Sequence, residues 1–366
     1  MMASAARLCR KCILNLTPYV PGKPIEEVKR ELGLDDVVKL ASNENPLGPS
    51  PLAIEAMRNA LDNIAQYPEG SCFELREAVA GHLGVDPDML IFGAGADEVI
   101  HYLGVALLDS GDEIVQANPS FVQYKAASTL MDCPAQMVDL NDWTHDLDGM
   151  LARVNENTKM FFITNPNNPT GTLVSADQVE AVLDALPERC LLVLDEAYYE
   201  YADDLNYTRS IDWIKQGRNV IALRTFSKIY ALAGTRVGYG VAPKQIIDLL
   251  ERVRAPFNVN SVAQAGALAS LSDPTQVSRS REQNQRGKKY FYDQLDQMGL
   301  SYTPTQANFL WIDVGRDCRE VFNGLLRLGV IVRTGDIFGC PTHIRVTTGT
   351  DEQNTRFIES LRKVLK

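Results

Sequence analysis

Between residues 89 and 241 the sequence alternates short apolar runs with stretches of helical pattern. Each run has the length of a buried strand, and turn-forming residues separate it from the helix that follows. Helices regularly placed between strands predict a mostly parallel sheet that is covered on both faces. The predicted strands cover residues 89–92, 113–117, 135–138, 160–164, 190–194, 219–223 and 237–241.

The pattern changes after about residue 260. A long, charged helix is expected over residues 276–298, and the elements after it are typical of a smaller α+β domain. They comprise strands at 308–312, 330–333 and 343–347 and helices at 318–328 and 351–364. We therefore expect an α/β fold in three parts: an N-terminal arm that contributes to the small domain (1–40), a large domain (41–260) and a small C-terminal domain (261–366).

The composition limits which partners the protein can bind and in which compartment it is expected. The chain has 47 acidic and 36 basic residues, a net charge of −11, and no basic run, which argues against nucleic acid as a partner. No stretch approaches the roughly 18 apolar residues of a membrane span. The seven cysteines are scattered and odd in number, as expected for thiols in a reducing compartment, so we expect a cytoplasmic protein.

A metal site is not expected. Cys9 and Cys12 form a lone CxxC pair without a second pair or nearby histidines, whereas structural zinc needs four ligands. None of the four histidines lies in an HExxH pattern.

Lys228 lies in a stretch, residues 223–240, that combines an amine, two hydroxyls and a guanidinium. An apolar run follows the lysine and suggests a poorly hydrated site, where the neutral amine is favoured and can form a Schiff base with an aldehyde. Thr225, Ser227 and Arg236 are together typical of a phosphate-binding cradle. The combination indicates a phosphorylated aldehyde, pyridoxal 5′-phosphate (PLP). A solvated surface lysine is the alternative.

Residues 93–97 begin like a dinucleotide-binding turn, GxGxx, between a predicted strand and a predicted helix. The third glycine would fall at Glu98, so the dinucleotide fingerprint is incomplete. The backbone N–H groups of Ala96 and Asp97 would still lie at a helix N-terminus, which favours an anion. An ordinary turn between strand and helix is the alternative.

Polar side chains also follow the predicted strands 160–164 and 190–194, and α/β sheets bind ligands at the carboxyl ends of their strands. Asn168 lies in a turn with two prolines and a glycine, where its amide can donate to a ring oxygen. Asp195 either caps the next helix or pairs with a buried cation, such as a protonated pyridine nitrogen that makes the ring an electron sink. Tyr198 is positioned to share the ring oxygen with Asn168.

Several motifs occur in the order found in one enzyme family. They are NENPLGPS, YPEG, GAGADE, NPNNPTG, DEAYYEY, RTFSKIYALAGTRVGYG and HIRVTTGT. The chain resembles the histidinol-phosphate aminotransferases, which belong to the fold type I, aspartate aminotransferase-like PLP enzymes. The resemblance extends over roughly residues 14 to 364.

The resemblance implies roles for the matching residues in cofactor binding and catalysis. Lys228 would bond to the cofactor and move the proton during catalysis, Asp195 would pair with the pyridine nitrogen, and Asn168 and Tyr198 would bind the ring oxygen. Phe121 matches an aromatic residue that stacks on the ring. The phosphate would be held by the backbone of Ala96 and Asp97 and by Thr225, Ser227 and Arg236. Tyr67 matches a tyrosine that reaches the partner subunit's site, which implies a homodimer.

Two arginines are candidates for the substrate side. In the predicted strand 343–347, Arg345 lies on the opposite face from Ile344 and Val346, so it can face a cleft while they pack inward. It matches a family arginine that binds an α-carboxylate, and Arg333 matches one near the substrate's phosphate. Tyr19, Asn43 and Asn168 match positions that line the substrate side. The alternative is that these arginines lie on the solvent-exposed side of their strands and bind no substrate.

The resemblance implies transamination between L-histidinol phosphate and 2-oxoglutarate, a step of histidine biosynthesis, by a ping-pong mechanism. The substrates would be a small amino donor and a 2-oxo acid acceptor. An aromatic amino-acid aminotransferase is the alternative, followed by a threonine-phosphate decarboxylase-like enzyme. A transcription regulator with an aminotransferase-like module is disfavoured because the resemblance starts near residue 14, and a dehydrogenase by the missing glycine. The sequence does not decide which amino donor is preferred.

Overall fold

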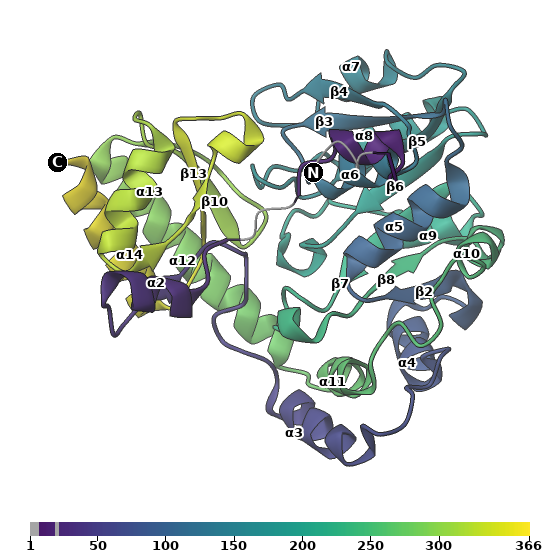
Figure 1. Ribbon diagram of the computed structural model, residues 1–366, viewed down its shortest axis with the longest axis horizontal. Helices are drawn as coiled ribbons and strands as arrows, with labels where there is room; N and C mark the ends of the chain where they lie inside the picture. Colours follow the sequence, from purple (N-terminus) through teal and green to yellow (C-terminus); the bar gives the residue numbers. More distant parts are fainter. Residues whose placement is uncertain (1–6, 19–21) are drawn as a thin grey trace.

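The computed structural model describes residues 7–18 and 22–366, which form two lobes, each built around its own main sheet (Figure 1). The larger lobe contains a seven-stranded sheet in the order β2-β8-β7-β6-β5-β3-β4. Strand β8 is antiparallel to both neighbours, and the other pairs are parallel. The strands are β2 (Leu90–Gly93), β3 (Glu113–Asn118), β4 (Ala135–Asp139), β5 (Thr158–Thr164), β6 (Leu191–Asp195), β7 (Val220–Thr225) and β8 (Gly238–Val241). The predicted mostly parallel sheet is confirmed.

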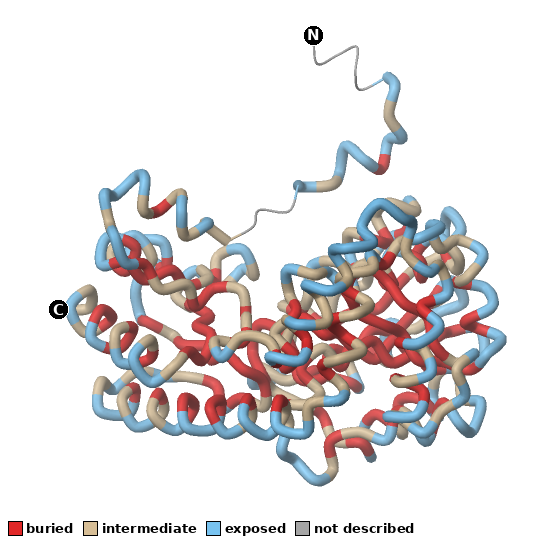
Figure 2. The backbone as a smooth tube through the Cα atoms, turned by 90° about the horizontal axis from the view of Figure 1, so that it is seen from below, coloured by how far each residue is buried: buried red, intermediate tan, exposed pale blue. Residues whose placement is uncertain are grey.

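Helices cover both faces of this sheet because its strands are apolar on both sides. In β5, Phe161 packs into the core that includes Val179 of α8, while Phe162 packs into the opposite core with Tyr124 of α6. The helices of the larger lobe that follow its strands are α5 (Ala96–Leu107), α6 (Gln123–Leu130), α7 (Leu147–Leu151), α8 (Ala176–Ala185), α9 (Ser210–Lys215) and α10 (Lys244–Leu250). Figure 2 shows the buried strands running through the interior of this lobe.

A group of three helices lies beside the sheet, where α11 packs against α3 and α4. These helices are α3 (Pro51–Ala60), α4 (Phe73–Leu83) and α11 (Ser261–Leu271). Helix α3 begins at Ser50, whose side chain caps it by accepting from the backbone N–H of Leu52. The sequence does not predict helix α11, because small and apolar residues occupy all sides of the helix and it lacks a distinct polar face.

The smaller lobe contains a four-stranded antiparallel sheet in the order β12-β13-β10-β9, packed against long helices. Its strands are β9 (Ser301–Thr303), β10 (Phe309–Asp313), β12 (Arg333–Thr334) and β13 (His343–Thr347). Its helices are α2 (Ile25–Leu32), α12 (Gln276–Met298), α13 (Cys318–Arg327) and α14 (Asp351–Leu365). Phe291 of α12 and Phe357 of α14 meet in its core with ring centroids 5.5 Å apart.

The strand predicted at 330–333 is divided between two sheets. Strand β11 (Val330–Ile331) pairs in parallel with β1 (Val38–Lys39), so the N-terminal segment joins the smaller lobe. Arg333 and Thr334 instead form β12 and pair with β13. Pairing with two different partners redirects the chain at the buried Val332, which a pattern of alternating residues does not reveal. Among the described residues, no helix combines the length and apolar character that crossing a bilayer requires.

Candidate active site

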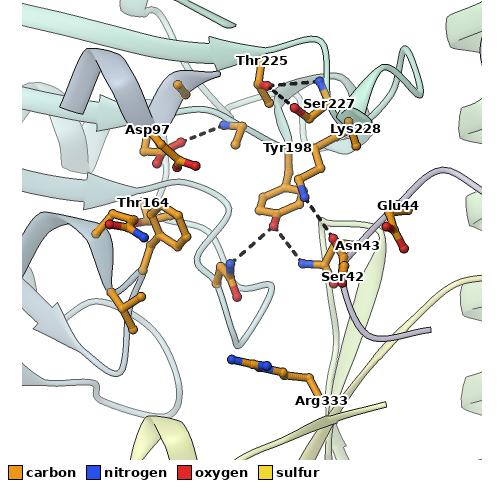
Figure 3. A pocket seen from close by; sticks show the side chains of 18 of the residues that line it. Ser42, Asn43, Glu44, Asp97, Thr164, Tyr198, Thr225, Ser227, Lys228 and Arg333 are labelled. Carbon is orange, nitrogen blue, oxygen red and sulfur yellow. Dashed lines mark hydrogen bonds between the residues drawn. The ribbon is translucent and has the colours of Figure 1, made fainter. Parts of the chain in front are cut away.

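A cavity of about 370 Å³ opens where the carboxyl ends of the central strands meet the smaller lobe (Figure 3). Side chains from both lobes line it. The predicted site residues along its wall are Asn43, Ala96, Asp97, Phe121, Asn168, Asp195, Tyr198, Thr225, Ser227, Lys228, Arg236, Arg333 and Arg345. Residues that are more than 300 positions apart in sequence therefore converge on one site.

The Lys228 amine lies in the interior of this cavity, where its Nζ donates to the Ser42 carbonyl at 3.2 Å. Nζ also lies 5.7 Å from the centre of the Tyr198 ring. Burial, followed by the nearby Arg345 guanidinium, lowers the pKa of Lys228 to about 8. The neutral, nucleophilic form is therefore much more accessible at neutral pH than in an exposed lysine.

Asp195 is the last residue of β6 and is only 4% exposed. Its Oδ2 accepts a hydrogen bond from the Tyr124 hydroxyl at 2.6 Å, and its Oδ1 accepts from the Ala197 N–H at 3.0 Å. Burial raises the pKa of Asp195 to about 6, and the two hydrogen bonds oppose this rise. A carboxylate held in this way is suited to a cationic ring nitrogen.

A polar cluster connects Tyr198 to the smaller lobe. The Tyr198 hydroxyl accepts from the Asn43 amide at 2.8 Å and from the Asn168 amide at 3.4 Å. Arg345 donates from one guanidinium nitrogen to Asn168 Oδ1 and from the other to the Ala41 carbonyl at 2.8 Å. Burial raises the pKa of the Tyr198 hydroxyl to about 12, so it remains protonated and can donate to a ligand oxygen.

The proposed phosphate cradle lies at the N-terminus of α5. The Thr225 hydroxyl donates to Ser227 Oγ at 2.9 Å, and Arg236 donates to the same oxygen at 3.3 Å. Gly95, with φ of +84°, allows this approach, because a Cβ there would lie 2.3 Å from an Arg236 nitrogen. A Cβ at Gly238 would lie 2.5 Å from the Ala96 N–H. Two hydroxyls, a guanidinium and a helix N-terminus together fit a phosphate group.

Arg333 and Arg345 form a directly opposed pair across β12 and β13. Ile344 and Val346, which flank Arg345, are fully buried in the core of the smaller lobe, as the alternation along the strand predicts. Arg345 is 7% exposed and faces the cavity. The two guanidinium groups give this wall a positive charge that suits anionic substrates.

Two predicted residues are not placed in the cavity. Tyr67 is 82% exposed and stacks on Phe257, with ring centroids 4.8 Å apart. Tyr19 lies outside the described residues. Phe121 does line the cavity, and its ring packs edge-on against that of Tyr124 with centroids 5.6 Å apart.

Sequence reasoning missed Tyr124, which contacts Asp195 directly. It also missed Phe338, which joins the lining from the short helix η6 (Asp336–Phe338). Tyr124 is the third residue after Phe121, and at a helix start this spacing directs both aromatic rings to the same side. The spacing is the sequence signal that could have identified Tyr124. The stretch around Phe338 has no comparable pattern.

Comparisons with known proteins identify the family of this chain. The family model described as aminotransferase class I and II matches residues 35–361. A histidinol-phosphate aminotransferase from Moorella thermoacetica is 53% identical over 98% of this chain and 93% of that protein. One from Caldicellulosiruptor saccharolyticus is 45% identical over 97% of this chain and 99% of that protein.

Solved structures give the same result. The histidinol-phosphate aminotransferase of Sinorhizobium meliloti, in complex with PLP, superposes with a TM-score of 0.89 at 28% identity, over 96% of this chain and 97% of that one. An aspartate aminotransferase from Thermus thermophilus shares the fold at 23% identity, with a TM-score of 0.84 over 97% of this chain and 99% of that one. This chain belongs to the class I and II aminotransferases and, within them, to the histidinol-phosphate aminotransferase family.

Proposed function

We propose that this aminotransferase transfers the amino group of L-histidinol phosphate to 2-oxoglutarate, in histidine biosynthesis. The observation that carries the proposal is that Lys228, Asp195 and the phosphate cradle face one cavity whose opposite wall carries Arg333 and Arg345. The high identity to relatives named histidinol-phosphate aminotransferase supports the choice of amino donor.

Membership in the class I and II aminotransferases implies PLP as the cofactor. When bound, PLP supplies an aldehyde that reacts with amines and a conjugated ring that accepts electrons from the carbon next to the nitrogen. Lys228 would hold the aldehyde end and Asp195 the ring nitrogen, while Asn168 and Tyr198 would hold the ring oxygen. The phosphate would lie among Thr225, Ser227, Arg236 and the backbone of Ala96 and Asp97, with Phe121 against the ring.

The protein's own contribution to chemistry is proton transfer in a dry, charged site. The Lys228 amine, with its pKa lowered to about 8, can take a proton from a substrate carbon and return it at neutral pH. Asp195 would hold the proton on the ring nitrogen through its buried carboxylate. Because Lys228 and the two arginines face the same cavity, we infer that donor and acceptor occupy it in turn, which is a ping-pong mechanism.

The charges of the two substrates match the arginine wall. Histidinol phosphate carries a phosphate and no carboxylate, whereas 2-oxoglutarate carries two carboxylates. A guanidinium can form paired hydrogen bonds with either anion. We assign Arg345 to the α-carboxylate of the acceptor and Arg333 to the phosphate of the donor. The opposed positions of the two arginines on neighbouring strands support a single anion-binding wall that serves both half-reactions.

We further propose that the enzyme is a cytoplasmic homodimer, in which Tyr67 reaches the partner's site. The stacked pair of Tyr67 and Phe257 lies exposed, together with apolar side chains of the same region. These are Leu61, Ile64 and Phe73, each more than half exposed. Several large apolar side chains left exposed in one region favour burial against a second copy. Sedimentation velocity is expected to give a dimer at micromolar concentration, and a monomer there would overturn this assignment.

The function is tested by comparing amino donors. With PLP and 2-oxoglutarate present, histidinol phosphate is expected to give the highest kcat/KM in a panel that includes phenylalanine and tyrosine, measured as glutamate formed. A clear preference for either aromatic amino acid would replace the proposal with an aromatic aminotransferase. Release of carbon dioxide from threonine phosphate would indicate the decarboxylase instead.

A further inference from the structure

A buried tyrosine lies behind the carboxylate assigned to the ring nitrogen. Tyr124 of α6 is 1% exposed, and its ring stacks on Phe162 of β5 with centroids 4.5 Å apart. Its hydroxyl donates to Asp195 Oδ2 at 2.6 Å, a short bond of the kind formed to an ionised oxygen. The packing of the ring therefore fixes the position from which the hydroxyl reaches Asp195.

The Tyr124 hydroxyl belongs to a buried chain of hydrogen bonds. It lies 2.9 Å from Thr164 Oγ1, which in turn lies 2.9 Å from Ser120 Oγ. Ser120 is also 2.9 Å from Asn167 Oδ1. The orientation of the Asn167 side chain follows from its amide nitrogen, which donates to the Pro119 carbonyl at 3.2 Å. Asn167 therefore ends the chain as an acceptor.

The number of protons available to this hydrogen-bond chain affects the ionisation of Asp195. Three hydroxyls, those of Tyr124, Thr164 and Ser120, share four contacts between Asp195 and Asn167. An ionised carboxylate only accepts, so Tyr124 donates to it and Thr164 donates to Tyr124. One contact of Ser120 then lacks a proton. A protonated Asp195 would supply the fourth proton and fill every contact.

We propose that Tyr124 is a positioning residue for the reaction, whose hydroxyl holds Asp195 in the ionised form in which it can bind a protonated ring nitrogen. This inference rests on the proposed function, because it places the cofactor's ring nitrogen against Asp195. The Tyr124 bond opposes two influences that favour a neutral Asp195. These are burial of the carboxyl and the missing proton at Ser120.

Two substitutions separate the roles of the chain members. Tyr124→Phe keeps the ring that stacks on Phe162 and removes only the donor, so the ionised Asp195 loses a charge-assisted bond. The pKa of Asp195 is then expected to rise by about one pH unit or more. Ser120→Ala is the matched control, because it removes the hydroxyl whose contact lacks a proton. It is expected to leave the pKa unchanged or slightly lower.

The first measurement uses the apoenzyme and does not depend on the cofactor. Carbon-13 NMR of labelled aspartate carboxyls, with the Asp195 signal assigned by its loss in Asp195→Asn, gives the titration midpoint directly. The inference predicts that the titration midpoint of Asp195 is higher in Tyr124→Phe than in the wild-type protein. In Ser120→Ala the midpoint should be unchanged or slightly lower. Equal midpoints in wild type and Tyr124→Phe, or an equal rise in both variants, would overturn it.

The second measurement reads the ring itself. With PLP labelled with nitrogen-15 in the ring, the ring signal of Tyr124→Phe is expected to move toward the unprotonated form, while Ser120→Ala keeps the wild-type position. Incorporating 3-fluorotyrosine at position 124 provides a stronger donor of similar size and should lower the Asp195 midpoint. This replacement preserves a test if Tyr124→Phe does not fold, and no lowering would count against the inference.

The two hypotheses fail in different ways. If the wild-type protein does not bind PLP, the proposed function is wrong whatever the titration of Asp195. If PLP binds and histidinol phosphate is transaminated, but Tyr124→Phe changes neither the Asp195 midpoint nor the ring nitrogen signal, only the positioning role of Tyr124 is refuted.

Discussion

At the scale of single residues, burial determines the protonation states of the groups in the site. Burial disfavours a charge on either group, so it lowers the pKa of Lys228 to about 8 and raises that of Asp195 to about 6. The Arg345 guanidinium adds to the effect on Lys228 through repulsion. The cavity thus contains an amine that loses its proton easily and a carboxyl group that still ionises at neutral pH, which suits proton transfer.

The rate at which the apoenzyme captures PLP should report the Lys228 amine. Because only the neutral amine attacks an aldehyde, the rate is expected to rise with a midpoint near pH 8. An ordinary lysine would give a midpoint near about 10.4. The measurement is the initial growth of the visible absorption of bound cofactor across this pH range.

Arg345→Gln provides the contrast for this measurement. Removing the positive charge relieves repulsion of the ammonium form, so the midpoint of capture should move to higher pH. Arg327→Gln, at an exposed position on α13, is the matched control and should leave the midpoint in place. A wild-type midpoint near 10, or equal shifts in both variants, would contradict this account of Lys228.

Among the elements, β6 and β7 matter most, because their ends carry Asp195 and Thr225. The residues adjacent to these two, Glu196 and Arg224, form an ion pair at 2.8 Å with side chains 0% and 3% exposed. Glu196 also accepts from the hydroxyls of Thr208 and Ser210. The Arg224 guanidinium lies 3.7 Å from the centre of the Tyr199 ring. These contacts join the two strand ends behind the site.

Glu196→Gln should destabilise the fold because it leaves the Arg224 charge buried without its counter-ion. We expect a loss of about 3–5 kcal/mol in the free energy of unfolding, measured by denaturant titration of the apoenzyme. Asp177→Asn breaks the exposed pair with Arg209, which is also 2.8 Å long, and should have a much smaller effect. Equal losses in the two variants would show that burial of the Glu196–Arg224 pair is not what stabilises these strand ends.

The two lobes of the molecule meet through the segment at residues 41–43. Arg345 donates to the Ala41 carbonyl, the Asn43 N–H donates to Thr347 Oγ1 at 2.9 Å, and the Asn308 amide donates to the Asn43 carbonyl at 3.1 Å. Asn43 adopts φ of +57° and extends its own amide to Tyr198. The segment therefore connects the arginine wall of the smaller lobe to the cofactor side of the cavity.

Much of this architecture could be predicted from the sequence. Regular alternation of apolar strands and helices is a local pattern, so the mostly parallel sheet and the position of Asp195 at a strand end were predictable, whereas β7 continues to Thr225, two residues beyond the predicted strand. The motifs around Lys228 and Arg345 were enough to predict that both residues line one cavity. The domain boundaries at 40/41 and 260/261 and the roles of the individual site residues stay predictions.

Other features depend on contacts between distant residues and were not predictable. Which strand Val330 pairs with is decided by the position of Val38, far away in the chain. The contact of Tyr124 with Asp195 requires α6, which packs against β3 and β4, to bring its tyrosine to the end of β6. The role of Tyr67 stays a prediction, because its ring lies exposed beside Phe257 and the proposed contact is with a second subunit.

The central claim is that Lys228 is the amine at which the cofactor is bound, and chemical trapping tests it most directly. The enzyme with bound PLP is reduced with borohydride, digested and mapped by mass spectrometry. We predict that the reduced cofactor is found on the peptide that contains Lys228, and that Lys228→Ala carries none. Labelling of a different lysine, or no labelling of the wild-type enzyme, would contradict the account.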